Sequence, residues 1–382
     1  MIRLPPLLFR LTSVDETDPF VANALRDRKH FEPCWCGTRK KYKKCHYLRE
    51  QKVPYTIGQL LSLQQKVFWR NRGCMHPLAS PTTCNGRVID SHTIQRQGPL
   101  ERIIDETGHV MHFEPNSTDS EFVASKIGWR NASVFPGYCA SHDSSLFSPL
   151  EKGPFTGEHR QCVLQAFRNV CNELYRKQAL IESLEFQRNI IDRGRKRDEQ
   201  INLQLSYTRN IEGQKKSLEE MRRLWTKFES ALIQNKFETF VNKCYFFRGE
   251  LNIVSSSVFQ CEFDFDGKKL IDMWDLSQDA EMLSHSIMST NEGGAIVFVW
   301  LKSEITPEIV VSSFDNLPDD EKGDIFVQYC FLNCENTYFA ERWWEKLISK
   351  NREQIKRFSR MLYYEGGKFV ANENRLVNWS FS

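Results

Sequence analysis

Residues 33–46 read PCWCGTRKKYKKCH, and this stretch decides how the front of the chain folds. It contains four candidate metal ligands: Cys34, Cys36, Cys45 and His46. Zinc prefers four thiolate or imidazole ligands in a tetrahedron, so a Cys-x-Cys turn closed by an adjacent Cys-His pair suits it. Gly37 lets the chain fold back between the two pairs. The spacing predicts a structural zinc site with no open coordination position.

So short a segment has no hydrophobic core of its own, and we expect metal binding to supply its folding energy. Five of the six residues from Arg39 to Lys44 are basic. Such a loop could hold phosphate, RNA or an acidic protein surface.

These residues resemble the SEC-C motif, a small zinc module, and depart from it little: Thr38 stands where the motif usually has serine. The resemblance covers about fourteen residues of the chain. It implies zinc bound by all four ligands. Because SEC-C modules serve as adaptors for proteins or ribosomes, the resemblance leaves the partner open.

A second set of candidate ligands lies further along the chain, at Cys74, Cys84, Cys139 and His142. The first two cysteines flank a proline-containing knuckle, and the other two ligands stand three residues apart at the expected start of a helix. Two ligands from a knuckle and two from a helix start describe a treble-clef zinc site. His76 is the alternative ligand.

The order of knuckle, strand with histidine and helix-start ligands over residues 70–150 resembles a degenerate HNH, or ββα-metal, nuclease core. The resemblance implies that His92 is the general base that activates water for attack on a phosphodiester. It also implies that Asp143 could hold a catalytic magnesium or manganese ion and that Asp90 could assist.

Two departures from the HNH pattern leave the activity open. Ser91 stands where the family usually has an acidic residue before the histidine, and Asn131 lies eight residues before Cys139 rather than a few. The alternative role for His92 is a hydrogen-bonded histidine that pins the hairpin.

The rest of the chain divides by composition. Apolar residues at helical spacing predict long helices over Gly157–Asp192 and through Leu218–Leu232, as a helical hairpin or a dimer-forming coiled coil. Beyond them we expect an α+β region with the following elements: strands at Cys244–Phe247, Val258–Phe265, Ala295–Leu301 and Ile325–Leu332, and a closing helix at Glu341–Leu362.

The fold class is therefore α+β, with small zinc-stabilised N-terminal modules, a long helical middle and a mixed C-terminal domain. The expected domains are an N-terminal segment (1–29), a SEC-C-like zinc module (30–50), an HNH-like treble-clef module (51–153), the long helices (154–242) and an α+β domain (243–382).

Composition limits the function classes. The chain of 382 residues is 40% hydrophobic and 26% charged with a net charge of +3, which excludes a fully disordered chain and gives no bulk argument for nucleic acid. The longest clean apolar run, Ala295–Leu301, is far shorter than the roughly 20 residues of a membrane helix. Met1–Leu11, interrupted by prolines and Arg10, makes a poor signal peptide. We expect a cytoplasmic protein without a membrane partner, whose cysteines are reduced.

Two functions remain. The first is a two-zinc protein that acts on DNA or RNA as an HNH-like, metal-dependent endonuclease, an arrangement similar to proteins of phage defence. The second is a non-catalytic zinc-stabilised adaptor that binds RNA, the ribosome or a protein. In either case the long helices offer a surface for a protein partner or a homodimer.

Overall fold

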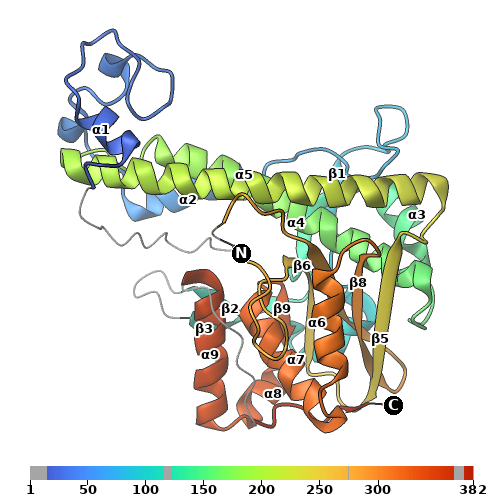
Figure 1. The fold of residues 1–382 in the computed structure, drawn as a ribbon. Coiled ribbons are helices and arrows are strands. Elements are labelled where there is room, and N and C mark those ends of the chain that lie inside the picture. Colours follow the sequence, from blue (N-terminus) through green and yellow to red (C-terminus); the bar gives the residue numbers. More distant parts are fainter. Residues whose placement is uncertain (1–14, 116–121, 274, 365–373, 382) are drawn as a thin grey trace. The chain divides into compact units, whose positions relative to one another are not determined.

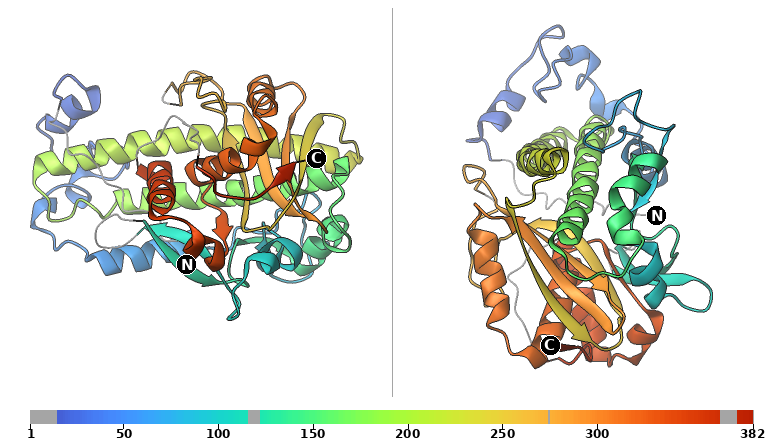
Figure 2. Two further views of the ribbon diagram at one scale, coloured as in Figure 1. Left: turned by 90° about the horizontal axis from the view of Figure 1, so that it is seen from below. Right: turned by 90° about the vertical axis from the view of Figure 1, so that its right-hand side faces the viewer.

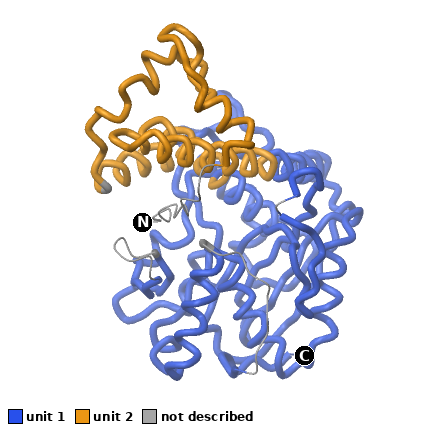
Figure 3. Tube along the Cα trace, turned by 60° about the vertical axis from the view of Figure 1, so that its left-hand side comes forward, with its two compact units in different colours: residues 1–6, 71–175, 219–382 blue, residues 7–70, 176–218 orange. Residues whose placement is uncertain are grey.

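A computed structural model describes residues 15–115, 122–273, 275–364 and 374–381. The first fourteen residues of the expected 1–29 segment lie outside the described residues. The chain divides into two compact units (Figure 3). Of the described residues, unit 1 holds 71–115, 122–175, 219–273, 275–364 and 374–381, and unit 2 holds 15–70 and 176–218.

The architecture is α+β, as expected (Figure 1). The elements in chain order are α1 (Pro19–Leu25), α2 (Ile57–Phe68), β1 (Val88–His92), β2 (His109–Pro115), β3 (Phe122–Gly128), β4 (Val134–Cys139), α3 (Ala140–Glu151), α4 (His159–Arg188), α5 (Arg197–Gln234), β5 (Phe240–Arg248), β6 (Ile253–Gln260), β7 (Met282–Ser289), β8 (Gly293–Leu301), α6 (Thr306–Asp315), α7 (Asp319–Asn333), β9 (Thr337–Phe339), α8 (Glu341–Lys346), α9 (Ser349–Tyr364) and β10 (Ser380–Phe381). Short helical turns lie at Tyr42–Lys44, Arg49–Gln51, Arg96–Leu100 and Glu101–Ile103.

The two long helices α4 and α5 each pass through both units, and within each unit they pack against each other. In unit 1 the rings of Phe167 and Phe228 lie 5.9 Å apart. In unit 2 Glu185 and Lys215 form an ion pair of 2.6 Å. The two helices are therefore partners within one chain, as the helical-hairpin alternative expects. A homodimer or coiled coil through them remains a prediction.

Unit 1 is built on an eight-stranded antiparallel sheet with the order β10-β5-β8-β7-β6-β9-β2-β3. Its strand β8 is buried along its whole length, as are most residues of β6 and β7. Continuous burial requires cover on both faces of a sheet, and this explains why β8 reads as an unbroken apolar run.

Helices cover both faces of this sheet (Figure 2). Successive side chains of a strand point to opposite faces. On β7, Ser284 and Ser286 accept hydrogen bonds of 3.0 Å from Asn169 of α4. The intervening His285 instead packs edge-on against Phe326 of α7. The α4 face is thus a polar, hydrogen-bonded layer, while the α7 face carries the aromatic core.

Three expected elements of the C-terminal region differ from the structure. Of the strand expected at Val258–Phe265, only the first three residues belong to a strand, because β6 ends at Gln260. Ile325–Leu332, expected as a strand, lies within helix α7, whose residues from Lys322 to Leu332 are all buried. A helix that is buried on all sides is largely apolar all round, so short-range periodicity cannot distinguish it from a buried strand. The single closing helix expected at Glu341–Leu362 is divided into α8 and α9, because the backbone at Leu347 is extended.

The segment between β1 and β4 contributes two strands to the eight-stranded sheet, although β1 and β4 themselves do not belong to it. Strands β2 and β3 form a hairpin, and Met111 of β2 pairs with Phe339 of β9. Ile103 and Val110 belong to the same hydrophobic cluster as the C-terminal strands. Strands β1 and β4 are left to form a separate two-stranded antiparallel sheet.

Candidate metal centres

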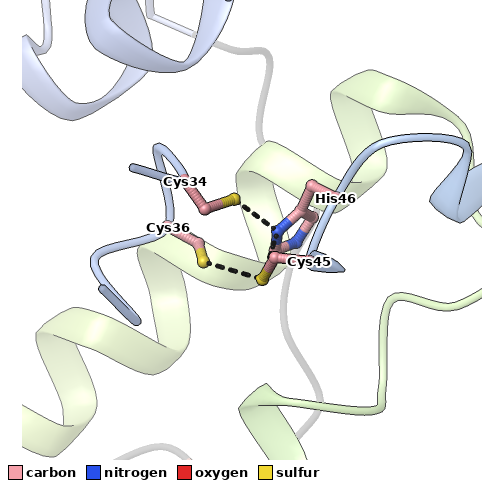
Figure 4. A group of neighbouring side chains, drawn as sticks. All are labelled: Cys34, Cys36, Cys45 and His46. Atoms are coloured by element: carbon pink, nitrogen blue, oxygen red, sulfur yellow. Dashed lines mark hydrogen bonds between the residues drawn. The ribbon is translucent and has the colours of Figure 1, made fainter. Parts of the chain in front are cut away.

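The first cluster brings together all four donors of the 33–46 segment: Cys34, Cys36, Cys45 and His46 (Figure 4). All four residues are buried, and their donor atoms lie within 4.8 Å of one another. The Sγ atoms of Cys36 and Cys45 are 3.6 Å apart, and Nδ1 of His46 lies 3.1 Å from Sγ of Cys34.

These separations fit a tetrahedral zinc ion. With Zn–S near 2.3 Å and Zn–N near 2.0–2.1 Å, adjacent donors stand about 3.8 Å (S to S) and about 3.6 Å (S to N) apart. The chemistry of the set, three thiols and one imidazole nitrogen, also selects zinc over magnesium or calcium. The cluster can therefore hold zinc, and four protein ligands leave no position for a substrate.

The local backbone explains how so short a segment converges. The amide of Cys34 donates to the carbonyl of Lys40 at 2.8 Å, which closes the loop between the two halves of the cluster. Gly37 has a φ of 76°, a left-handed conformation that glycine adopts without strain. The amide of Cys45 bonds to the carbonyl of Tyr42 at 3.0 Å and ends the short helical turn there.

The segment has no core of its own, as expected, but it packs into a core that other elements complete. Trp35 is 2% exposed and belongs to a hydrophobic cluster that includes Val21 of α1 and Ile201 of α5. The guanidinium of Arg197 lies 4.5 Å from the centroid of a Trp35 ring. The module therefore borrows apolar surface from α1 and from the first turns of α5, which the 33–46 sequence cannot indicate.

Asp192, which the sequence analysis missed, lies directly behind the cluster. Its Oδ2 is 2.7 Å from Nε2 of His46, and its Oδ1 accepts a 2.6 Å hydrogen bond from Nε of Arg49. Burial alone would raise the pKa of Asp192, but His46 and Arg49 lower it overall. Burial likewise acts to lower the pKa of His46, but hydrogen bonds to Asp192 and Cys36 outweigh burial, so that the pKa is raised overall.

The second cluster brings together Cys74, Cys84, Cys139 and His142, again with all donor atoms within 4.8 Å. Nδ1 of His142 lies 3.4 Å from Sγ of Cys74, 3.7 Å from Sγ of Cys84 and 3.3 Å from Sγ of Cys139. These distances fit a tetrahedral zinc ion as well as those of the first cluster do. The two knuckle cysteines are only partly buried.

The placement of this cluster follows from the β1–β4 sheet. Cys139 ends β4 and caps helix α3, so that His142 projects from the first helical turn. The amide of Met75 donates to the carbonyl of Gly137 at 2.8 Å, and that of Cys139 points at Sγ of Cys74 at 3.4 Å. These contacts hold the knuckle against the end of β4.

His76, the alternative ligand, is not part of the four-donor group. Its ring stacks on that of His142, with centroids 4.0 Å apart and planes 5° apart. Its Nδ1 accepts a hydrogen bond of 3.0 Å from the amide of Leu78. His76 therefore covers a ligand rather than being one in this arrangement.

Of the three candidate catalytic residues, Asp143 directly follows a donor of the second cluster, whereas His92 lies at the other end of the β1–β4 sheet: Val88 pairs with Cys139, and His92 pairs with Val134. His92 is the last residue of β1, Asp90 precedes it by two positions on the exposed part of the same strand, and Asp143 follows the ligand His142 on α3. Among the described residues, buried Nε2 of His92 and Oδ1 of Asp143 have no hydrogen-bond partner. Burial lowers the pKa of His92 to about 4 and raises that of Asp143.

A buried arginine next to these residues, paired with an exposed glutamate, was also missed. Arg168 of α4 is 1% exposed, and its Nη2 bonds Oε1 of Glu151 at 2.6 Å while its guanidinium stacks over Phe147. The positive charge of Arg168 lowers the pKa of both His92 and Asp143. Its Nε and Nη1 have no partner among the described residues. An arginine in the middle of a helix carries no spacing signal, so the sequence could not show it.

Comparison with known proteins identifies the first cluster. The family model of the SEC-C motif matches residues 32–48. The chain is also 20% identical over 154 residues to a methionine aminopeptidase of Chlamydia muridarum (strain MoPn / Nigg), a match that covers 38% of this chain and 51% of that protein. The chain thus spans about half the length of this curated relative. No solved structure matches.

The SEC-C match includes all four ligands of the first cluster and agrees with the resemblance seen in the sequence. The second cluster lies outside the matched residues and stands on its geometry alone. Among the helices that the structure describes, none has an apolar stretch able to cross a membrane.

Proposed function

We propose that this protein binds zinc at both clusters and acts on nucleic acid, with the second cluster organising an HNH-like ββα module that hydrolyses phosphodiesters. The observation that carries the proposal is that the candidate base and the candidate metal-binding carboxylate each have a buried atom with no partner among the described residues: Nε2 of His92 and Oδ1 of Asp143. A buried polar atom without a protein partner can bond a water, an ion or a substrate group.

The local topology supports this proposal. The antiparallel pair β1–β4 leads directly into α3, a two-strand and helix arrangement similar to that of the ββα-metal family, with β2 and β3 inserted between its two strands. The zinc ligands Cys139 and His142 lie where β4 passes into α3, and β1 carries His92 at the other end of the pair. In this proposal zinc is structural, and it orients the residues that perform the reaction.

His92 would act as the general base. With its pKa lowered to about 4 by burial, the ring is neutral at pH 7 and can accept a proton. A hydrogen bond with the backbone of Arg130 acts to raise this pKa, but burial outweighs it. Nε2 of His92 has no partner among the described residues. Water attacks phosphorus as its proton moves to Nε2, the P–O bond to the leaving oxygen breaks, and that oxygen takes a proton from solvent.

Asp143 would hold a magnesium or manganese ion, which supplies stabilisation of the negative charge on the leaving oxygen when it is bound. A buried carboxylate oxygen without a partner fits such a cation. The Ser91 hydroxyl also acts on this carboxylate and lowers its pKa. The family usually has an acidic residue at the position that Ser91 occupies in this chain. In this proposal Asp143, which interacts with Ser91, provides that acidic group instead. Asp90, exposed on the same strand, would assist from the solvent side.

A non-catalytic adaptor is the second candidate, and the first cluster favours it. Its basic loop places five exposed cationic side chains next to the zinc ligands: Arg39, Lys40, Lys41, Lys43 and Lys44. None of them forms an ion pair with another described residue. Unpaired lysines and arginines on one loop suit the phosphates of RNA or an acidic protein surface.

A nuclease assay separates the two functions. Zinc-loaded protein is incubated with DNA and RNA in magnesium or manganese, and wild type is compared with His92→Ala and with the matched control His109→Ala, a partly exposed histidine of β2. We expect cleavage by wild type and by the control, and loss of cleavage in His92→Ala at unchanged zinc content. Binding without cleavage by wild type in either metal would support the adaptor instead.

A further inference from the structure

The segment from His46 to Arg49, which follows the last ligands of the first cluster, is hydrogen-bonded to the turn between α4 and α5. Nε2 of His46 lies 2.7 Å from Oδ2 of Asp192. The amide of Gly194 donates to the carbonyl of Arg49 at 3.1 Å, and Nη2 of Arg49 donates to the carbonyl of Asn189. Two segments about 140 residues apart in sequence are thus joined by hydrogen bonds from both their side chains and their backbones.

The carboxylate of Asp192 is the centre of this junction. Its side chain is 0% exposed, and it bonds His46 through Oδ2 and Arg49 through Oδ1. Nε2 of Gln204 adds a third hydrogen bond, 2.9 Å from Oδ2. Because a buried carboxylate is costly unless it is paired and hydrogen-bonded, these partners are what allow Asp192 to lie there.

The orientation of His46 follows from these contacts. Its Nδ1 faces the thiols of Cys34 and Cys45 at 3.1 and 3.3 Å, while its Nε2 faces Asp192. A carboxylate behind a histidine ligand fixes the tautomer that leaves the other nitrogen free for the metal, and it makes that nitrogen a stronger donor. Cys-x-Cys and Cys-His spacing alone does not supply such a partner.

We propose that Asp192 is a positioning residue of the first zinc centre, so that the turn of the helical hairpin, residues 189–194, is part of that centre. The zinc module is then not an independent appendage: its affinity for metal depends on a residue 146 positions further along the chain. This proposal does not depend on any nuclease activity.

The test measures zinc affinity in the full-length protein with the variants Asp192→Ala and Asp192→Asn. Competition with a chromophoric chelator gives the affinity of each of the two zinc equivalents, and cobalt substitution reports ligand geometry through its visible spectrum. We expect Asp192→Ala to weaken one equivalent by about 10–100-fold, the usual effect of removing an outer-shell partner, and to alter its cobalt spectrum. Asp192→Asn, which keeps an acceptor oxygen, should weaken it less.

Two internal references make the result decisive. The second cluster, in the other unit, should keep its affinity, and the matched control Glu185→Gln removes a half-exposed carboxylate of α4 that pairs with Lys215 and not with a zinc ligand. Unchanged affinity in Asp192→Ala would overturn the proposal. Equal weakening of both zinc equivalents would also overturn it, because the effect would then be general unfolding.

Discussion

The two Cys/His clusters share a donor set of three cysteines and one histidine, but they differ in what surrounds them. The first has four buried ligands, and the outer nitrogen of its histidine is bonded to Asp192. The second has two partly buried cysteines, and the ring of its histidine stacks on that of His76. Four buried protein ligands with a hydrogen-bonded partner behind the histidine suit a structural role.

Loss of either zinc should have the largest effect. We expect Cys34→Ser and Cys139→Ser each to reduce the zinc content from two ions per chain to one, because a tetrahedral site that loses a thiolate loses most of the ~10–16 kcal/mol of apparent binding free energy of structural zinc. Metal analysis by mass spectrometry measures the stoichiometry. The control Cys244→Ser, at a cysteine outside both clusters, should keep two; one zinc ion in wild type would contradict the two-centre description.

Replacement of the proposed base should be the next largest effect. We expect His92→Ala to slow phosphodiester cleavage by about 10²–10⁴-fold, the usual contribution of general acid–base catalysis, while both zinc ions remain bound. Single-turnover cleavage rates at saturating magnesium measure this. A change of less than about threefold would exclude His92 as the base and would leave it as a histidine that pins the hairpin.

The basic loop should contribute to binding but not to metal content. We expect the double variant Lys40→Glu and Lys43→Glu to bind RNA or DNA more weakly and to make the slope of log affinity against log salt shallower by about 2. Titrations at several salt concentrations measure the slope. The matched variant Lys236→Glu with Lys302→Glu, which changes two exposed lysines elsewhere, should leave it unchanged; equal effects of both pairs would show that the loop has no special role.

The pH dependence of cleavage should be small. For a base with a pKa of about 4, the neutral, proton-accepting form is present above that pH and is lost as pH falls through it. Between pH 7.5 and pH 5 the rate of the zinc-loaded protein should therefore change by less than about twofold. If the base were an ordinary histidine with a pKa near 6.5, the cleavage rate would fall about 30-fold over the same pH range. A loss of that size at constant zinc content would show that His92 is not buried as described.

The smallest effect is expected at His76. Because its ring only stacks on His142, His76→Ala should keep two zinc ions per chain and weaken the second centre by less than about tenfold, the value of one aromatic contact. Chelator competition measures this affinity. A fall to one zinc ion would instead make His76 a ligand and remove one of the four assigned donors from the second centre.

The local parts of both clusters could be predicted from the sequence because metal ligands reveal themselves by residue type and spacing. Cys34, Cys36, Cys45 and His46 converge through a loop of a dozen residues, and all eight expected donors assemble into two groups. The long helices were predictable for a similar reason, since apolar residues at helical spacing form a local pattern. Ile325–Leu332 shows the limit: a largely apolar stretch, interrupted only by Gln328, is compatible with both a buried helix and a buried strand.

By itself, the sequence determined the two donor sets, their order along the chain and the α+β class, because each of these depends on residues close together in the chain. Only the tertiary structure decided that Asp192 supports His46, that Arg168 lies beside His92 and Asp143, and that β2 joins β9 in the large sheet. Each of these depends on contacts between residues far apart in the chain. Such contacts are selected by burial, charge pairing and strand register in the folded state, and leave no periodic or spaced pattern in the sequence.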